Sequence, residues 1–323
     1  MIIKSQLLRG LFGIDKETLQ DLCFTFDNLS IFKTALQSGT SVFKKVASIF
    51  VDEKNDKDIE NEEYENFIKK PINWHRQNAL IKFDEILDIK DFEKIDSVRE
   101  LDDICQDIEE KTIACQKEIN KNFKGKNIID FQMHNISVLE KAFSKMDKDD
   151  QKEIGKDIDD HFKELSKKHK SFNQLLKKIK SDFGVKDFNY KSIKKILKND
   201  NYLKELLIID DEKGQFIRFI LFELVIEIGK SLVGKTKFYG NVMAASTAVL
   251  FIFTGGLEAL LAGGFTGVVD RFRGKKAKMT ILCYSVFLIS LSSLENLDPF
   301  DEIKEYIKEH NKDEFSFEEE VSF

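Results

Sequence analysis

One long apolar run constrains this chain more than any other feature. Residues 241–269 read NVMAASTAVLFIFTGGLEALLAGGFTGVV and carry a single ionisable side chain, Glu258, in a chain that is 33% charged. At about 1.5 Å per residue, a helix of that length would exceed the roughly 30 Å core of a bilayer. A second uncharged run, residues 279–294, follows a short basic loop. The sequence therefore favours a membrane-active helical protein.

Composition predicts an all-α fold, in which a soluble helical bundle precedes an apolar, membrane-inserting helical module. The 323 residues include only 2 Pro and 16 Gly, which leaves little turn chemistry for a many-stranded sheet. Nine of those glycines lie between Gly229 and Gly274. We therefore predict three parts: a soluble charged helical domain (1–211), an apolar membrane-active helical module (212–297) and an acidic tail (298–323).

Local signals predict several helices within the first part. Ser97–Glu100 is a plausible capping box, and the helix that follows is expected to run to about Phe123. Apolar residues at helical spacing predict one buried face for residues 148–168, through Ile154, Ile158 and Phe162. Ser171 and Gln174 suggest a second capping box, at the start of the next helix.

Three segments compete for the role of a membrane span. The first, residues 216–233, is apolar but charged at several positions; the other two are the uncharged runs. The loop 270–278 is basic and prefers the cytoplasmic side of a membrane. It returns to that side only if the first segment also spans. A module stored in soluble form, which inserts when triggered, is the remaining arrangement. We expect the loop to contact lipid headgroups through Arg271, Arg273, Lys275 and Lys276.

Carboxylates and small residues within these segments suggest roles in a helical assembly. Intramembrane carboxylates usually face a bundle interior or a water path, so we expect Glu223, Glu227 and Glu258 to line or gate a pore. Small residues let helix backbones approach closely in lipid. The expected helix-packing positions are Gly255, Gly256, Gly263 and Gly267.

The stretch AASTAVLFIFTGGLEALLAGGFTGVVDRF resembles the hydrophobic hairpin of colicin-type pore-forming domains. The resemblance covers some 30 residues. It aligns Thr254-Gly255 with the family's Thr-Gly turn and Asp270 with its closing acidic residue. It implies that amphipathic helices wrap the hairpin in solution and that the hairpin inserts to form an ion-conducting pore. Here about 50 residues follow, with another apolar run, where the family's chain stops.

Residues 229–236, GKSLVGKT, match the P-loop pattern G-x4-G-K-[ST]. In that alternative, Gly229, Gly234, Lys235 and Thr236 would hold nucleotide phosphates and Mg²⁺. Fewer than about 90 residues follow, without the alternating strands and helices that such folds need. The competing interpretation is a lysine-bearing turn that contacts lipid headgroups.

The sequence thus predicts a non-enzymatic protein that permeabilises a bilayer or forms a channel, as a toxin or cell-suicide effector. A homo-oligomer in the membrane is expected, with no cofactor, no metal and, at a net charge of −6, no nucleic acid. The start of the chain lacks a Sec signal, which predicts cytoplasmic synthesis and association with the inner or cell membrane. The alternatives are the P-loop protein and a soluble scaffold or partner-binding protein with a buried apolar hairpin.

Overall fold

The computed structural model describes residues 3–27, 66–89, 95–145, 148–168, 170–182, 184–186, 190–208, 214, 217–218, 220–225, 275–292 and 299–311. Within these ranges every regular element is a helix, and no strand occurs. The predicted all-α class is therefore confirmed for this part of the chain. The three-part division stays a prediction.

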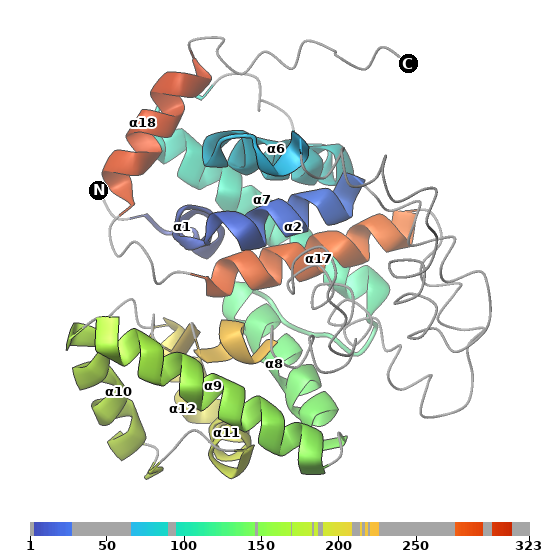
Figure 1. The fold of residues 1–323 in the computed structure, drawn as a ribbon. Coiled ribbons are helices and arrows are strands. Elements are labelled where there is room, and N and C mark those ends of the chain that lie inside the picture. Colours follow the sequence, from blue (N-terminus) through green and yellow to red (C-terminus); the bar gives the residue numbers. More distant parts are fainter. Residues whose placement is uncertain are drawn as a thin grey trace, which may run out of the picture.

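The helices form two groups joined by α8 (Figure 1). We call the first the α17 group: α1 (Gln6–Gly13), α2 (Lys16–Asp27), α6 (Ile72–Leu87), α7 (Val98–Ile119), α17 (Lys275–Leu291) and α18 (Phe300–His310). The second, the α9 group, contains α9 (Lys148–Lys168), α10 (Lys170–Asp182), α11 (Tyr190–Leu197) and α12 (Asp200–Ile208). The connecting helix α8 (Ile128–Lys145) contacts α7 and α17 on one side and α11 and α12 on the other.

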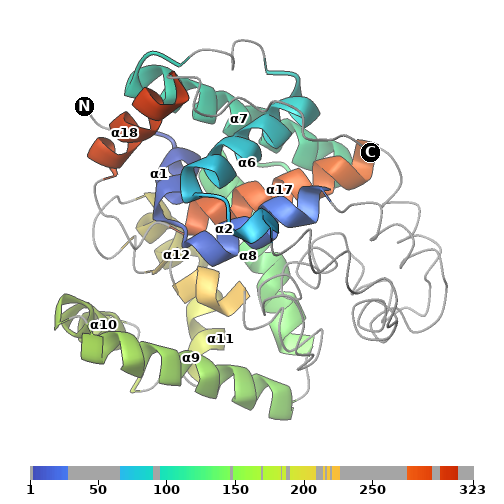
Figure 2. The same ribbon diagram turned by 45° about the horizontal axis from the view of Figure 1, so that its top comes forward.

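Helix α17 lies at the centre of its group, although it comes late in the chain (Figure 2). It packs most extensively on α7 and α1, and further contacts come from α6, α2 and α8. A single hydrophobic core runs through both groups. Helices from both sides of the predicted boundary at residue 212 therefore pack together.

The capping signals explain where some of the helices begin. The Ser97 hydroxyl accepts a hydrogen bond from the Glu100 backbone N–H at 3.2 Å, as the capping box predicts. The Glu100 carboxylate accepts from the N–H of Asp96, one residue earlier than in the standard box. The second predicted box is wrong, because Ser171 lies inside α10, which begins at Lys170.

Helix α7 ends at Ile119, four residues before the predicted end at Phe123. Asn120 leaves the helical conformation at φ −130° and ψ 96°. Phe123 then packs edge-on against Phe131 of α8, with the ring centroids 6.3 Å apart. The apolar Phe123 therefore anchors the connection to α8 rather than continuing the helix.

None of the described helices combines the length and the apolarity needed to cross a membrane. The longer apolar run, residues 241–269, lies outside the described residues. Part of the first candidate segment is described: residues 217–218 and 220–225 are helical, and their apolar side chains are buried. Arg218 is also buried there, and its guanidinium donates a hydrogen bond to the Leu207 carbonyl of α12.

Candidate functional site

From Met279 onward, helix α17 is buried on every face. Each residue from Met279 to Ser292 is buried, and no charged side chain occurs among them. An ordinary surface helix buries one stripe, and a helix that is apolar all round needs either a protein shell or lipid. Here the helices that contact α17 in the described part of the chain form a protein shell around it.

The closest crossing in this shell joins α1 to α17 at Gly10. A Cβ atom built on Gly10 would lie 1.7 Å from the carbonyl oxygen of Ile289, so only glycine permits this approach. The hydroxyl of Ser292 donates to the Gly10 carbonyl at 3.1 Å and to the Ile289 carbonyl at 2.7 Å. The two helices therefore meet backbone to backbone.

Two serines at the C-terminal end of α17, Ser290 and the following Ser292, hydrogen-bond to the backbone of that helix, whereas the hydroxyl of Ser285 is buried without a hydrogen-bond partner among the described residues. Ser290 donates to the Phe287 carbonyl at 2.9 Å, and Ser292 bonds in the same way to Ile289. The amide of Gln132 on α8 adds a hydrogen bond to the Ser290 hydroxyl at 3.0 Å. Hydroxyls that return to their own backbone reduce the cost of placing a helix in an apolar medium. The chemistry of α17 thus suits both a protein core and a bilayer.

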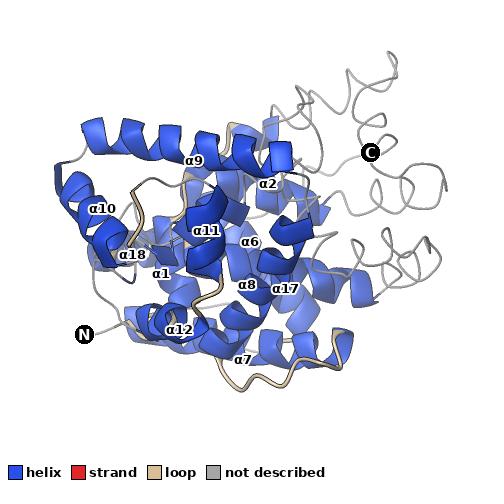
Figure 3. Ribbon diagram, turned by 90° about the horizontal axis from the view of Figure 1, so that it is seen from below, coloured by secondary structure: helices blue, strands red, loops and turns tan. Residues whose placement is uncertain are grey.

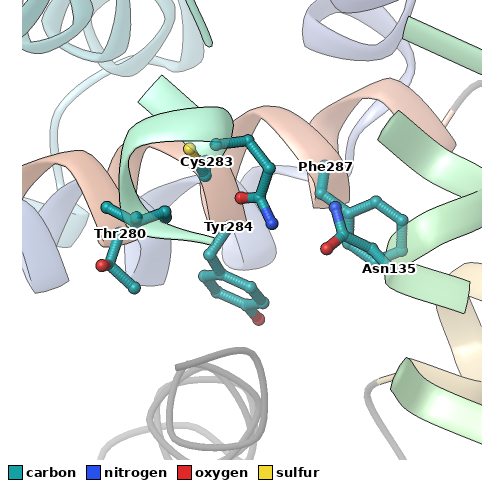
Figure 4. Close-up of a pocket in the computed structure, with 7 residues that line it drawn as sticks. Asn135, Thr280, Cys283, Tyr284 and Phe287 are labelled. Carbon is teal, nitrogen blue, oxygen red and sulfur yellow. The ribbon is translucent and has the colours of Figure 1, made fainter. Parts of the chain in front are cut away.

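A narrow pocket opens beside α17 (Figure 4). It has room for about one water molecule, far below the roughly 300–1,000 Å³ of a metabolite site. Its lining comes from α7, α8 and α17: Gln116, Ile119, Asn135, Thr280, Cys283, Tyr284 and Phe287. We therefore assign no small-molecule substrate to it.

Two buried carboxylates of α7 hold the start of α1. The Asp102 carboxylate accepts hydrogen bonds from the backbone N–H groups of Lys4 and Ser5, at 3.1 and 2.9 Å. The Glu109 carboxylate accepts from the Leu7 N–H at 2.7 Å and from the Ser5 hydroxyl at 2.8 Å. These bonds satisfy N–H groups that a helix start leaves without an intrahelical partner, and a negative charge is favourable there.

Burial raises the pKa of Glu109 to about 7. The hydrogen bonds from Leu7, Ser5 and Gln6 act in the opposite direction, and the nearby Asp102 adds a smaller upward effect. Desolvation of the carboxylate therefore outweighs the donors that surround it. Glu109 changes its charge near neutral pH at the point where α1 attaches to α7.

A buried arginine attaches α18 to the same group. Arg76 of α6 forms an ion pair with Glu302 of α18 at 2.6 Å and donates to the Leu11 carbonyl of α1 at 3.1 Å. Its guanidinium also lies 4.2 Å from the centre of the Phe12 ring. Burial lowers the pKa of Arg76, while Glu302 raises it. Helix α18, within the predicted acidic tail, is thus part of the folded core.

His75, next to Arg76, is buried and neutral. Burial, with a smaller contribution from Lys16, lowers its pKa to about 4. Its Nε2 lies 3.1 Å from the amide nitrogen of Gln20 on α2. Among the described residues, no cluster of His, Cys, Asp or Glu is arranged to hold a metal ion.

Most of the sequence-predicted site residues lie outside the described ranges. Of the three carboxylates, Glu223 is described: it is half-buried in the helical stretch 220–225. Lys275 and Lys276 begin α17. The remaining predicted positions are outside: Glu227, Glu258, Gly255, Gly256, Gly263, Gly267, Arg271, Arg273, Gly229, Gly234, Lys235 and Thr236.

The sequence reasoning missed the Asp102–Glu109 pair and Arg76. A signal for the pair was present, because positions 102, 105, 109 and 112 recur at helical spacing on one face of α7. Cys105 on that face marks it as the buried one. An acidic residue in such a stripe requires donors from another element, here the N-terminus of α1.

The fold defines the class of this protein: an all-helical protein built around a buried apolar central helix. No protein-family model matches the chain, and searches of curated proteins and of solved structures give no match either.

Proposed function

We propose that this protein inserts into a lipid bilayer and permeabilises it, as an oligomeric helical channel of a toxin or cell-suicide effector. The observation that carries the proposal is residues 241–269, which contain one ionisable residue, Glu258, in a chain that is 33% charged. Each Leu, Ile, Phe or Val at the centre of a span contributes about −0.3 to −0.6 kcal/mol, against about +3 for one charge. The proposal places synthesis in the cytoplasm and the action at the inner or cell membrane.

The packing of α17 supports a stored form that inserts when triggered. Its uncharged stretch, residues 279–292, is enclosed by helices that carry charge on their outer faces. Because α17 alone falls short of a span, the proposal assigns the crossing to residues 241–269, with α17 as an accompanying segment. The resemblance of residues 244–272 to the colicin-type hairpin agrees with this order of events.

A nucleotide site at residues 229–236 is not favoured. P-loops follow a strand, whose end places the glycine-rich turn. The described residues just before the motif, 220–225, are helical instead.

The direct test is release of a trapped dye from phospholipid vesicles by the purified full-length protein, together with fractionation of expressing cells. Release that rises with protein concentration, and recovery in the membrane fraction, are the expected results. No release at any pH, with full recovery in the soluble fraction, would overturn the proposal.

A second test concerns the polar path. Glu258→Gln removes the single charge of the apolar run, so we expect the current across a planar bilayer to lose cation preference while dye release persists. The matched control is Glu305→Gln, on the exposed side of α18. If both variants leave the ion selectivity of the current unaltered, Glu258 does not line the conducting path.

Burial of residues 279–292 on every side favours a second candidate: a soluble helical scaffold that binds a protein partner. In that case the apolar residues serve as a permanent core. Vesicles distinguish the two, because a permanent core gives neither binding to lipid nor release.

A further inference from the structure

One segment of the chain concentrates positive charge. Residues 167–198 contain eleven lysines and two aspartates, a net charge of +9 in a chain whose net charge is −6. The rest of the chain therefore carries −15. The segment runs from the end of α9 through α10 and α11, and these helices lie far from α18 (Figures 1 and 2). Figure 3 views them from below.

Two of these lysines, Lys186 and Lys195, lie at the turn between α10 and α11. The ammonium group of Lys195 on α11 lies 3.4 Å from the position of a Cβ built on Gly184, so it reaches over this turn. Lys186 follows in the turn, and Lys198 is one helical turn beyond Lys195; all three are exposed. We call Lys177, Lys178, Lys186, Lys194, Lys195 and Lys198 the basic surface.

These lysines differ from those of α9 in their partners. On α9, Lys152 pairs with Asp149 at 2.8 Å, and Lys163 pairs with Asp159 at 2.7 Å. Within the described part of the chain, no lysine of the basic surface forms an ion pair with a carboxylate. Their charge is therefore available to an outside partner.

We infer that the basic surface docks the protein on an anionic lipid bilayer. Clustered lysines attract a negatively charged membrane surface, with a contribution of about fivefold in binding per lysine. A nucleic acid is the weaker fit, because the chain as a whole carries a net charge of −6. This inference rests on the proposed function in naming a bilayer as the partner.

The test measures sedimentation of the full-length protein with vesicles of phosphatidylcholine, with and without phosphatidylserine. The variant Lys186→Gln/Lys195→Gln/Lys198→Gln removes three charges from the basic surface. The matched control, Lys152→Gln/Lys156→Gln/Lys163→Gln, removes three exposed charges from α9. Both sets are on the surface, so both variants should keep the wild-type thermal midpoint.

We expect the wild-type protein and the α9 control to bind phosphatidylserine vesicles, with binding that weakens as salt screens the charges. The basic-surface variant should bind on the order of a hundredfold more weakly. Equal binding by the two variants would overturn the inference, as would no binding by the wild-type protein. Binding to a duplex oligonucleotide in place of the vesicles would also overturn it.

The inference and the proposed function can fail separately. Binding to phosphatidylserine vesicles without dye release would support the basic surface and contradict permeabilisation. Equal dye release from both kinds of vesicle by all three proteins would support permeabilisation and contradict a role for the basic surface.

Discussion

Helices α17 and α9 differ in how much of their surface is buried in this fold. From Met279 to Leu291, α17 has no exposed position. By contrast, α9 buries Ile154, Ile158 and Phe162 on one face and exposes charged residues on the other. A helix with one apolar face needs neighbours on one side and stays in water on the other, whereas α17 needs neighbours all round. The two groups should therefore respond differently to the same kind of change.

The largest effect is expected where α17 meets α1. Gly10→Val places a side chain against the Ile289 carbonyl, which is backbone and cannot move aside as a flexible side chain would. The cost should exceed the roughly 1–3 kcal/mol of ordinary overpacking and approach about 5 kcal/mol in the free energy of unfolding. Urea denaturation measures it. A variant within about 1 kcal/mol of the wild-type protein would show that α1 does not cross α17 this closely.

Two phenylalanine truncations compare the groups directly. Phe287 of α17 and Phe162 of α9 are both almost fully buried. Phe→Ala costs about 3–5 kcal/mol in a core, and less where the surroundings relax into the space. We expect about 4 kcal/mol for Phe287→Ala and about 3 for Phe162→Ala, because α9 has a free outer side. Equal losses in urea denaturation would mean that α9 is held as rigidly as α17.

The sequence predicted the α9 face and could not predict the surroundings of α17. Ile154, Ile158 and Phe162 recur at four-residue spacing, and such a pattern has one structural solution. Residues 279–294 have no polar face, and lipid and a protein core select the same side chains. The length of this run favours a helix, and its uniform apolarity leaves the neighbours of that helix unspecified.

The same limit applies to the candidate site. Glu109 and Arg76 depend on elements far away in the chain, namely the start of α1 and the start of α18. Spacing within α7 marks Glu109 as inward-facing, but its donors, Ser5 and Leu7, lie about a hundred residues earlier. A local sequence pattern cannot predict hydrogen bonds or ion pairs between residues so far apart in the chain.

The α17 group should also depend on pH through Glu109. Its pKa rises from 4.5 to about 7 on folding, so the folded state binds the proton more tightly. Its contribution to stability is fully present below about pH 4.5 and is lost as the pH rises to about 7, by about 2–3 kcal/mol. Glu109→Gln removes this dependence.

Denaturation of the wild-type protein and of Glu109→Gln from pH 5 to 8 measures the difference between their free energies of unfolding. The contribution of His75 to the pH dependence acts in the opposite direction, and it cancels in this difference because both proteins contain His75. With its pKa lowered from 6.5 to about 4, His75 contributes stability above about pH 6.5 that is lost on acidification. A constant difference across the pH range would show that Glu109 stays in one protonation state.

The smallest effect is expected on the outer side of α9. Lys163 pairs with Asp159 and Asp160 at 2.7 and 3.0 Å; Lys163 and Asp160 are exposed, and Asp159 is half-buried. Exposed pairs at this spacing contribute little, since solvent and salt screen them. Lys163→Ala should leave the thermal midpoint unchanged within error, both at low salt and at high salt. A clear drop in the thermal midpoint at low salt that disappears at high salt would show that these ion pairs stabilise α9. The outer side of α9 would then contribute to stability, as the buried faces of α17 do.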